Sequence, residues 1–376
     1  MNFADDPAEA GFRAGLRAWL RDHLDEHREG TGYESAESVE RTLRWHRALA
    51  EAGYVGLSLP AAYGGHGLPD VYEGILNEEL ATAGAPASPP IGHIAHAVAD
   101  FASEELKARV LPGLLGCAEV WCQGFSEPGA GSDLAGLTTT ATADGDRFVV
   151  NGQKIWTSGA MWSDRCLLLA RTEPGLARHR GLSMLVVDMR SAGVDCREIV
   201  LASGSREFAE VFFDDVSVPA ANLVGERGQG WRIAMHMLAY ERGPADMGWV
   251  GRLGRVLAEA REDVRTGRVA ADAGLRLRLA EAAVDVEVLR WHVARSLAGR
   301  GGGSDGAAGS VDKLLTTRVE QNLYRVVSDL AGPSFVLGAP GPFADYLWSR
   351  AQSIYGGTQQ IQRQIVAQRV LGLPRA

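Results

Sequence analysis

The period of the hydrophobic pattern changes twice along this chain, and this feature constrains the fold more than any other. In "GFRAGLRAWLRDHL", near the start, Phe12, Leu16 and Leu20 recur at helical spacing. The later segment "TTTATADGDRFVVNGQKIWTS" alternates as β-strands do, and its Asp-Gly and Asn-Gly pairs predict tight turns. After "LVGERGQGW" the helical period returns and continues to the end. We therefore expect a chain that is helical, then β, then helical again.

The domain boundaries are expected where the period changes. They give an N-terminal α-helical domain over residues 1–116, a compact β domain over residues 117–227 and a C-terminal helical domain over residues 228–376. With 376 residues, 46% of them hydrophobic, the chain can bury more than one core. In the last domain, Gly243-Pro244 predicts a kink in a long helix that starts near Gly228.

Charge and composition exclude several classes of protein. The net charge is −9 and no Lys/Arg run is dense, so we expect no nucleic-acid partner. No apolar run approaches the roughly 20 residues that cross a bilayer. The acidic, amphipathic start "MNFADDPAEAGFRAGLRAWL" is unlike a signal or transit peptide, which predicts a cytoplasmic protein. The four cysteines form no CxxC pair and no His/Cys cluster has zinc spacing, so no metal site is predicted.

The segment "GFSEPGAGSD", residues 124–133, is named the glycine-rich loop here. Its glycines allow backbone N–H groups to approach a ligand closely, and its serines add donors for phosphate oxygens. It has the spacing of neither a Walker A motif nor a dinucleotide-binding fingerprint. The alternative is a tight surface turn without a ligand.

The segment "KIWTSG", residues 154–159, places an aromatic residue beside two hydroxyl residues. Trp156 could pack on a flat ring system while Thr157 and Ser158 hydrogen-bond to its heteroatoms. The alternative is that Trp156 is a core tryptophan.

A third candidate lies in "AYERGPADMGW". Glu241 falls at the edge of an apolar helical stripe, and Arg242 falls inside it. A carboxylate among apolar neighbours has a raised pKa, as a general base needs, although an adjacent guanidinium limits the rise. The alternative is a structural Glu–Arg ion pair.

Together these segments resemble the acyl-CoA dehydrogenase family over nearly the whole chain. "WCQGFSEPGAGSDLAGLTTTATADGDRFVVNGQKIWTSG" is similar to the family's flavin-binding signature. "GYVGLSLPAAYGGHGL", "FFDDVSVPAANLVGE" and "SIYGGTQQIQR" are similar to its other recurrent segments. The resemblance implies an α+β multidomain fold with an N-terminal all-α domain, a middle β-barrel domain and a C-terminal four-helix bundle. It also implies FAD bound between domains and subunits, in a homotetramer or homodimer.

The activity that the resemblance implies is α,β-dehydrogenation of an acyl-CoA thioester to the trans-2-enoyl-CoA. In the family a glutamate removes the α-proton, the β-hydrogen leaves as hydride to flavin N5, and electrons pass to electron-transferring flavoprotein. Many members carry that glutamate where this chain has Gly356. Glu241-Arg242 looks like the base position of the isovaleryl- and long-chain-type subset, which makes Glu241 the expected catalytic base.

The resemblance also assigns binding residues. Arg242, Gly356 and Ser132 are expected at the substrate, where the Gly356 N–H binds the thioester carbonyl and the missing side chain leaves room for a bulky acyl group. The residues expected at FAD are Phe125, Ser126, Gly131, Ser132, Trp156, Thr157, Ser158, Thr358 and Gln360.

Two departures from the family pattern concern FAD contacts across subunits. "AREDVRTGRVAADAG" has no Arg-x-Phe-Gly segment, and "SDLAGPSF" replaces a Gln-x-x-Gly-Gly-x-Gly turn. Such losses resemble actinobacterial members that form α2β2 heterotetramers, so a partner-subunit role is a second interpretation. A flavin oxidase or monooxygenase on the same fold is a third. The acyl group remains open between branched, long, steroid-derived and carrier-protein-bound thioesters.

Overall fold

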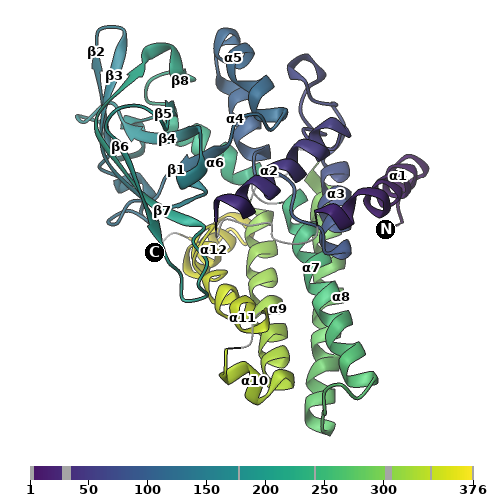
Figure 1. The fold of residues 1–376 in the computed structure, drawn as a ribbon. Coiled ribbons are helices and arrows are strands. Elements are labelled where there is room, and N and C mark those ends of the chain that lie inside the picture. Colours follow the sequence, from purple (N-terminus) through teal and green to yellow (C-terminus); the bar gives the residue numbers. More distant parts are fainter. Residues whose placement is uncertain are drawn as a thin grey trace.

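The computed structural model describes residues 4–27, 35–176, 178–240, 243–300, 307–338 and 341–374. Helices, then strands, then helices follow one another along the chain, so the predicted three-part fold class is confirmed. Figure 1 shows the strands on one side, α4 and α5 next to them, and the long C-terminal helices running below. Within the described ranges, no helix is both long and apolar enough to cross a bilayer.

The N-terminal helices form one hydrophobic core with the periodicity expected from the sequence. Leu16 and Leu20 are buried against Trp45 and Leu49, and Phe12 packs at the edge of the same cluster. Asp6 begins the first helix with a capping box, because its side chain accepts hydrogen bonds from the first-turn N–H groups. The helices are α1 (Pro7–His23), α2 (Ala36–Glu51), α3 (Asp70–Ala83), α4 (Gly92–Phe101) and α5 (Glu104–Leu115).

The strands form one sheet in the order β6-β7-β3-β2-β4-β5-β8, and β1 pairs in parallel with β4. Most neighbours are antiparallel, as short strands joined by tight connections predict. The strands are β1 (Trp121–Gly124), β2 (Thr140–Asp144), β3 (Arg147–Ser158), β4 (Arg165–Arg171), β5 (Leu182–Asp188), β6 (Val194–Ile199), β7 (Phe208–Pro219) and β8 (Leu223–Val224).

The two predicted turns of this region have different outcomes. The Asp-Gly pair closes the β2–β3 hairpin, where Asp144 faces Arg147, as predicted. The prediction of a turn at Asn151-Gly152 is wrong, because both residues lie within β3 at a shift of register against β7. Gly152 has a φ of 148°, and a Cβ there would lie 2.7 Å from the Thr139 Cα. Glycine is needed at this bulge for a close backbone approach.

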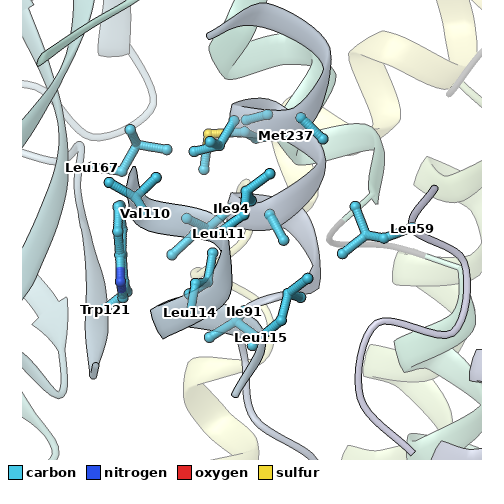
Figure 2. Close-up of a cluster of buried hydrophobic side chains, with 14 of the residues drawn as sticks. Leu59, Ile91, Ile94, Val110, Leu111, Leu114, Leu115, Trp121, Leu167 and Met237 are labelled. Carbon is cyan, nitrogen blue, oxygen red and sulfur yellow. The ribbon is translucent and has the colours of Figure 1, made fainter. Parts of the chain in front are cut away.

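Strand β4 is buried on both faces, which explains its unbroken apolar run "CLLLA". Cys166, Leu168 and Ala170 belong to the core between the strands. Leu167 and Leu169 face the other way and belong to the helical core. Figure 2 shows this shared core, with Leu167 and Trp121 of the sheet beside Val110, Leu111 and Leu114 of α5, Ile94 of α4 and Met237 of α6. The sheet is therefore fixed to the N-terminal helices by common packing.

The C-terminal helices pack around a third core formed mainly by α7, α8 and α9. The long helix expected from Gly228 is two helices, because α6 ends at Tyr240 and α7 begins at Pro244. Proline at the first helical position has no N–H to leave unpaired, which suits a new helix start. The helices are α6 (Gly230–Tyr240), α7 (Pro244–Arg265), α8 (Ala273–Arg300), α9 (Ala308–Ala331), α10 (Pro333–Val336), α11 (Pro342–Ala351) and α12 (Gln359–Ile365), followed by a π-helical turn (Val366–Val370).

Helix α9 carries two fully buried carboxylic residues, Asp312 and Glu320. Glu320 of α9 is fully buried, and neither carboxyl oxygen has a hydrogen-bond partner among the described residues. Burial raises the pKa of Glu320 to about 7, although the positive charges of Arg252, Lys313 and Arg350 oppose the rise. A substantial fraction of this side chain is therefore protonated at neutral pH.

Candidate functional site

A buried ion pair holds the glycine-rich loop against strand β3. Lys154 is fully buried, and its Nζ donates to Glu127 Oε1 at 2.9 Å and to the Phe125 carbonyl oxygen at 3.0 Å. The backbone N–H groups of Thr138 and Thr139 donate to the two oxygens of Glu127 at 2.7 and 2.9 Å. Glu127 thus ties the glycine-rich loop to strand β3 through Lys154 and to the segment before β2 through Thr138 and Thr139.

The surroundings of Glu127 and Lys154 shift the pKa of each group. Burial alone would raise the pKa of Glu127, but the Lys154 ammonium group and the hydrogen bonds from Thr139 and Thr138 outweigh it and lower the pKa to about 2. Burial lowers the pKa of Lys154, and Glu127 opposes that change. Both pKa values are lowered, which favours the charged form of Glu127 but disfavours the charged form of Lys154, because the carboxylate has several donors and the ammonium group has fewer compensating contacts. Sequence reasoning missed this pair, although a lysine at an inward position of an alternating strand was the available signal.

The C-terminal end of the glycine-rich loop is exposed to solvent. Ile155 N–H donates to the Ser126 carbonyl oxygen at 2.9 Å, and Glu127 and Ala130 exchange backbone hydrogen bonds. Phe125 is buried and Ser126 is partly buried, whereas Gly131 and Ser132 are exposed. A Cβ added at Gly131 would meet nothing within 4 Å. This end of the loop has open space above its backbone, as an approaching ligand requires.

The end of strand β3 has an irregular backbone at Trp156. Trp156 has a φ of 59° at a second shift of register in β3, and the residue is 54% exposed. The alternative of a core tryptophan is therefore wrong. Thr157 is buried, and its hydroxyl oxygen has no hydrogen-bond partner among the described residues, while Ser158 is exposed. An exposed indole beside an unsatisfied buried hydroxyl suits a flat ligand with polar edges.

Aromatic contacts connect this strand end to the C-terminal segment. The ring of Trp156 lies edge-on to Phe208 of β7, with 6.1 Å between ring centroids. Phe208 stacks on Trp348 of α11 at 5.8 Å, and Trp348 lies 6.2 Å from Tyr355. The structure therefore brings Trp156 and the loop before α12 to the same side of the molecule, 200 residues apart in the sequence.

Residues 352–358, between α11 and α12, are named the C-terminal loop here, and a side chain of α12 holds them in place. Gly356 and Gly357 have φ values of 59° and 94°, in the region that favours glycine. The buried side chain of Gln362 donates to both carbonyl oxygens, at 3.0 and 3.3 Å. Thr358 caps α12 by accepting from the Ile361 N–H, and Gln360 is exposed. Gln362 is a second positioning residue that sequence reasoning missed.

Glu241 and Arg242, the expected base and its neighbour, lie outside the described residues. The described residues on either side of them are Tyr240, which ends α6, and Gly243, which precedes α7. Tyr240 stacks on His96 of α4 with 3.9 Å between centroids and 10° between ring planes. On the other side, the Gly243 N–H donates to Asp246 Oδ2 at 2.9 Å and begins α7. The boundary between α6 and α7, where Gly243 has a φ of 105°, is named the helix break here.

A pocket of about 140 Å³ adjoins the helix break. We name it the break pocket, and it lies between α3, α4, the segment 54–59 and the residues Tyr240, Pro244 and Ala245. Asn77 of α3 fixes this wall, because its amide donates to the Glu73 carbonyl oxygen at 2.9 Å and to that of Pro244 at 3.4 Å. A larger hollow of about 620 Å³ near Tyr63 and Lys107 contains none of the predicted site residues.

Comparison with known proteins identifies the family. Models of acyl-CoA dehydrogenase domains match in chain order: the N-terminal domain over residues 6–117, the middle domain over 122–216 and the C-terminal domain over 228–371. Acyl-CoA dehydrogenase IpdE1 of Mycobacterium tuberculosis is 40% identical over 348 residues, which cover 90% of each chain. The chain belongs to the acyl-CoA dehydrogenase family. It is thus an oxidoreductase of a flavoprotein family that acts in lipid metabolism.

Further relatives agree with this membership. Acyl-CoA dehydrogenase FadE26 of Mycobacterium tuberculosis is 34% identical, with 87% of each chain covered. The solved Tcur3481-Tcur3483 steroid ACAD superposes with a TM-score of 0.89 at 28% identity and covers 100% of both chains. The ChsE4-ChsE5 complex from Mycobacterium tuberculosis gives 0.84 at 30% identity, again over 100% of both chains. The family implies FAD as the cofactor. The open loop, the exposed indole and the unsatisfied Thr157 hydroxyl are compatible with that group.

Proposed function

We propose that this chain, loaded with FAD, oxidises an acyl-CoA thioester to the trans-2-enoyl-CoA, with Glu241 removing the α-proton. One observation carries the proposal: the C-terminal loop has no carboxylate, while a pocket adjoins the helix break. Gly356 has no side chain, and at its φ of 59° a glutamate would be strained. The proton acceptor must then come from another segment. Glu241 lies in the sequence between Tyr240 and Pro244, both of which line the break pocket.

The residues proposed to hold FAD have separate tasks. Bound FAD supplies flavin N5 as the acceptor of the β-hydride. Trp156 offers an exposed ring for stacking, and the hydroxyl of Thr157 is available for a hydrogen bond. Thr358 uses a lone pair to cap α12 and retains its hydroxyl proton as a donor. The full proposed set is Phe125, Ser126, Gly131, Ser132, Trp156, Thr157, Ser158, Thr358 and Gln360.

The substrate residues act on a weakly acidic C–H bond. The Gly356 N–H would donate to the thioester carbonyl, where negative charge develops as the α-proton leaves. Ser132 and Arg242 would contact the thioester side of the substrate. Burial raises the pKa of Tyr240, next to Glu241, with the negative charges of Asp100 and Asp70 adding to the rise. A poorly hydrated neighbourhood of this kind favours a base with a raised pKa.

The experiment is anaerobic mixing of the FAD-loaded protein with a panel of acyl-CoA thioesters, followed by flavin absorbance. Bleaching with the wild-type protein and a loss of about 10²–10⁴-fold in the Glu241→Gln variant are expected, because general-base catalysis typically contributes that much. Glu259→Gln, an exposed position on α7 paired with Arg255, is the matched control and should bleach normally. Bleaching at full rate by Glu241→Gln would contradict the assignment of the base.

Electron-transferring flavoprotein is proposed as the acceptor of the flavin electrons. A flavin oxidase or monooxygenase would instead reoxidise with oxygen. Oxygen consumption without an acyl thioester would favour that reading, and reoxidation by electron-transferring flavoprotein after thioester bleaching would exclude it.

A second candidate role is that of one subunit type in an α2β2 enzyme. Its support is that two of the solved neighbours, Tcur3481-Tcur3483 and ChsE4-ChsE5, are two-component proteins. The chain also exposes apolar side chains that a partner could cover. On α8 these are Leu277, Val284, Val288 and Trp291, between 48% and 63% exposed, and after α9 they are Val336 and Leu337.

Flavin content per chain separates the two assemblies. A homotetramer or homodimer with complete sites should purify alone with about one FAD per chain and bleach with substrate. A chain that purifies with half this amount or less, and reaches full occupancy only after co-expression with a second acyl-CoA dehydrogenase chain, would support the α2β2 role. Light scattering of the same samples gives the mass.

A further inference from the structure

Glu320 of α9 is a buried titratable group that has no part in the proposed mechanism. Its side chain is fully buried, and within the described ranges neither carboxyl oxygen has a hydrogen-bond partner. The hydroxyl of Thr316, one turn earlier on the same helix, is likewise buried without a described partner. A carboxyl group in such a place is costly to ionise, so the groups around it decide its charge.

The face of α9 that carries Glu320 packs against α11, which leads into the C-terminal loop (Figure 1). The Tyr324 hydroxyl, one turn after Glu320, donates to Asp345 Oδ2 of α11 at 3.3 Å. The Thr317 hydroxyl, one turn before Glu320, lies 3.3 Å from the Gln352 carbonyl oxygen. Residues three or four apart lie on one face of a helix, so Glu320 faces the same elements as these two residues.

Three helices contribute charged and titratable groups around the Glu320 carboxyl. These groups are Arg252 of α7, Lys313 and Tyr324 of α9, and Asp345 and Arg350 of α11. Burial raises the pKa of Glu320 to about 7, and Asp345 adds to the rise while the three positive charges oppose it. Burial also raises the pKa of Tyr324 to about 12, so its hydroxyl stays neutral at physiological pH. Near pH 7 the Glu320 carboxyl is therefore divided between its neutral and its ionised form.

Two of these cations already hold α11 and the C-terminal loop. Arg252 donates from Nη2 to Asp345 Oδ1, in the first turn of α11, at 2.9 Å. Lys313 donates to Gln352 Oε1 at 3.0 Å, and its Nζ lies 4.1 Å from the centroid of the Tyr355 ring. An ionised carboxylate on the same face of α9 attracts both cations and competes with these contacts.

Helix α11 and the C-terminal loop carry residues of the candidate site. Trp348 of α11 stacks on Phe208 with 5.8 Å between centroids, and Phe208 lies edge-on to Trp156. Tyr355 directly precedes Gly356, whose N–H is proposed to bind the thioester carbonyl. A small displacement of such a donor is enough to slow a reaction, because its effect depends on its position at the developing charge.

We propose that Glu320 is a positioning residue for the Gly356 N–H, and that its neutral form keeps α11 and the C-terminal loop in the observed arrangement. While Glu320 is neutral, Arg252 and Lys313 stay on their partners in α11 and the loop. When Glu320 is ionised, it attracts both cations, their contacts weaken, and the Gly356 N–H is no longer held in place. This inference rests on the proposed dehydrogenation and adds a proton-dependent control of it.

Hydrogen–deuterium exchange of the FAD-loaded protein tests this control without substrate. The partner chain is included if flavin content requires one. Exchange of peptides from α11 and the C-terminal loop is measured at pH 6 and pH 8 and corrected for the intrinsic pH dependence of amide exchange. In the wild type the corrected exchange should be about tenfold faster at pH 8, because the ionised fraction of a carboxyl with a pKa of about 7 rises by about that factor.

Two variants show whether Glu320 causes the change. Glu320→Gln stays neutral, so its corrected exchange should be slow and equal at both pH values. Asp329→Asn is the matched control, because Asp329 lies on the same helix with its side chain 50% exposed, and it should behave as the wild type does. A third variant acts on an intact Glu320: Asp345→Asn removes a negative charge that raises its pKa, so the change in exchange should occur at lower pH.

Flavin bleaching by an acyl-CoA thioester measures the effect on the reaction. The ratio of the wild-type kcat to the kcat of Glu320→Gln should fall by about tenfold between pH 6 and pH 8, as the neutral fraction of Glu320 does. Titration of the proposed base affects both proteins equally and therefore cancels in this ratio.

The outcomes separate this inference from the proposed function. Equal corrected exchange at both pH values in the wild type, or the same change in Glu320→Gln, would overturn the inference and leave dehydrogenation standing. A pH-dependent exchange with a constant kcat ratio would also overturn it, because the loop would then not position the thioester. If no thioester bleaches the flavin of a fully loaded protein, the proposed dehydrogenation fails and the positioning role fails with it.

Discussion

Replacing Lys154 with methionine tests whether the buried ion pair holds the glycine-rich loop in place. Methionine keeps a long apolar stem but removes the ammonium group. Glu127 then loses the contact at 2.9 Å while its side chain remains 5% exposed, and the Phe125 carbonyl oxygen loses a donor at 3.0 Å. The variant therefore leaves a buried carboxylate with fewer partners.

The expected effect is large. Removal of one partner from a buried ion pair destabilises a protein by about 3–5 kcal/mol. The pKa of Glu127, about 2 against an ordinary 4.5, gives a similar figure, because that difference corresponds to about 3 kcal/mol at neutral pH. Since this pKa is lowered, the contribution is present above about pH 4.5 and is lost as the pH falls toward 2. At about 2 °C per kcal/mol, the low value that suits a chain of 376 residues, such a loss lowers Tm by about 6–10 °C.

The measurement is thermal unfolding of the flavin-free protein at neutral pH, together with flavin content after reconstitution. Arg147→Met is the matched control, because Arg147 lies on the same strand and pairs with Asp144 at 2.8 Å with both side chains at least 50% exposed. Such a pair contributes less than about 1 kcal/mol. Adding Glu127→Gln to Lys154→Met should recover much of the stability, since no unpaired charge remains buried. The reasoning is refuted if Lys154→Met unfolds at the same temperature as Arg147→Met.

Two further variants test buried polar groups. Thr157→Val removes a hydroxyl that has no partner among the described residues. The flavin-free variant should be as stable as wild type or more so, while its affinity for FAD falls about three- to tenfold. Lower stability together with unchanged FAD affinity in a fluorescence titration would contradict the proposed contact. Glu320→Gln tests the raised pKa of about 7, against an ordinary 4.5. The wild type should lose on the order of 3 kcal/mol of stability as the pH rises from about 5 to about 8, because the folded state holds a proton that the unfolded state releases. The variant should not show this loss, and identical pH profiles of Tm for the two proteins would refute the argument.

Several features of the fold could be predicted because they depend on neighbours in the sequence. The change from a period near 3.6 to alternation and back sets the order of helices and strands. The Asp-Gly hairpin also followed from local turn chemistry. Asn151-Gly152 does not form the turn that the dipeptide favours. Strand β7 pairs across that position, and the backbone of Thr139 lies against Gly152. A tertiary contact decided between a turn and a bulge where the dipeptide alone allowed both.

Some features of the candidate site could likewise be predicted from the sequence, and others could not. The residue types of the glycine-rich loop and of the Trp156 strand were recognisable in the sequence, because their chemistry is local. Which of them is exposed was not, and the indole of Trp156 proved to face outward at a positive φ. Lys154 and Glu127, 27 residues apart, showed no sign of their pairing beyond a charged residue at an inward strand position.

The sequence by itself therefore determined the three-part order, the family membership and the absence of a carboxylate at Gly356. Only the tertiary structure decided that Glu127 meets Lys154, that Phe208 joins Trp156 to Trp348, and that Ser58, Glu73 and His96 share one wall of the break pocket. The physical reason is that periodicity and turn chemistry act within a few residues. Contacts between distant segments depend on how helices and sheet share a core, as α4, α5 and β4 do here.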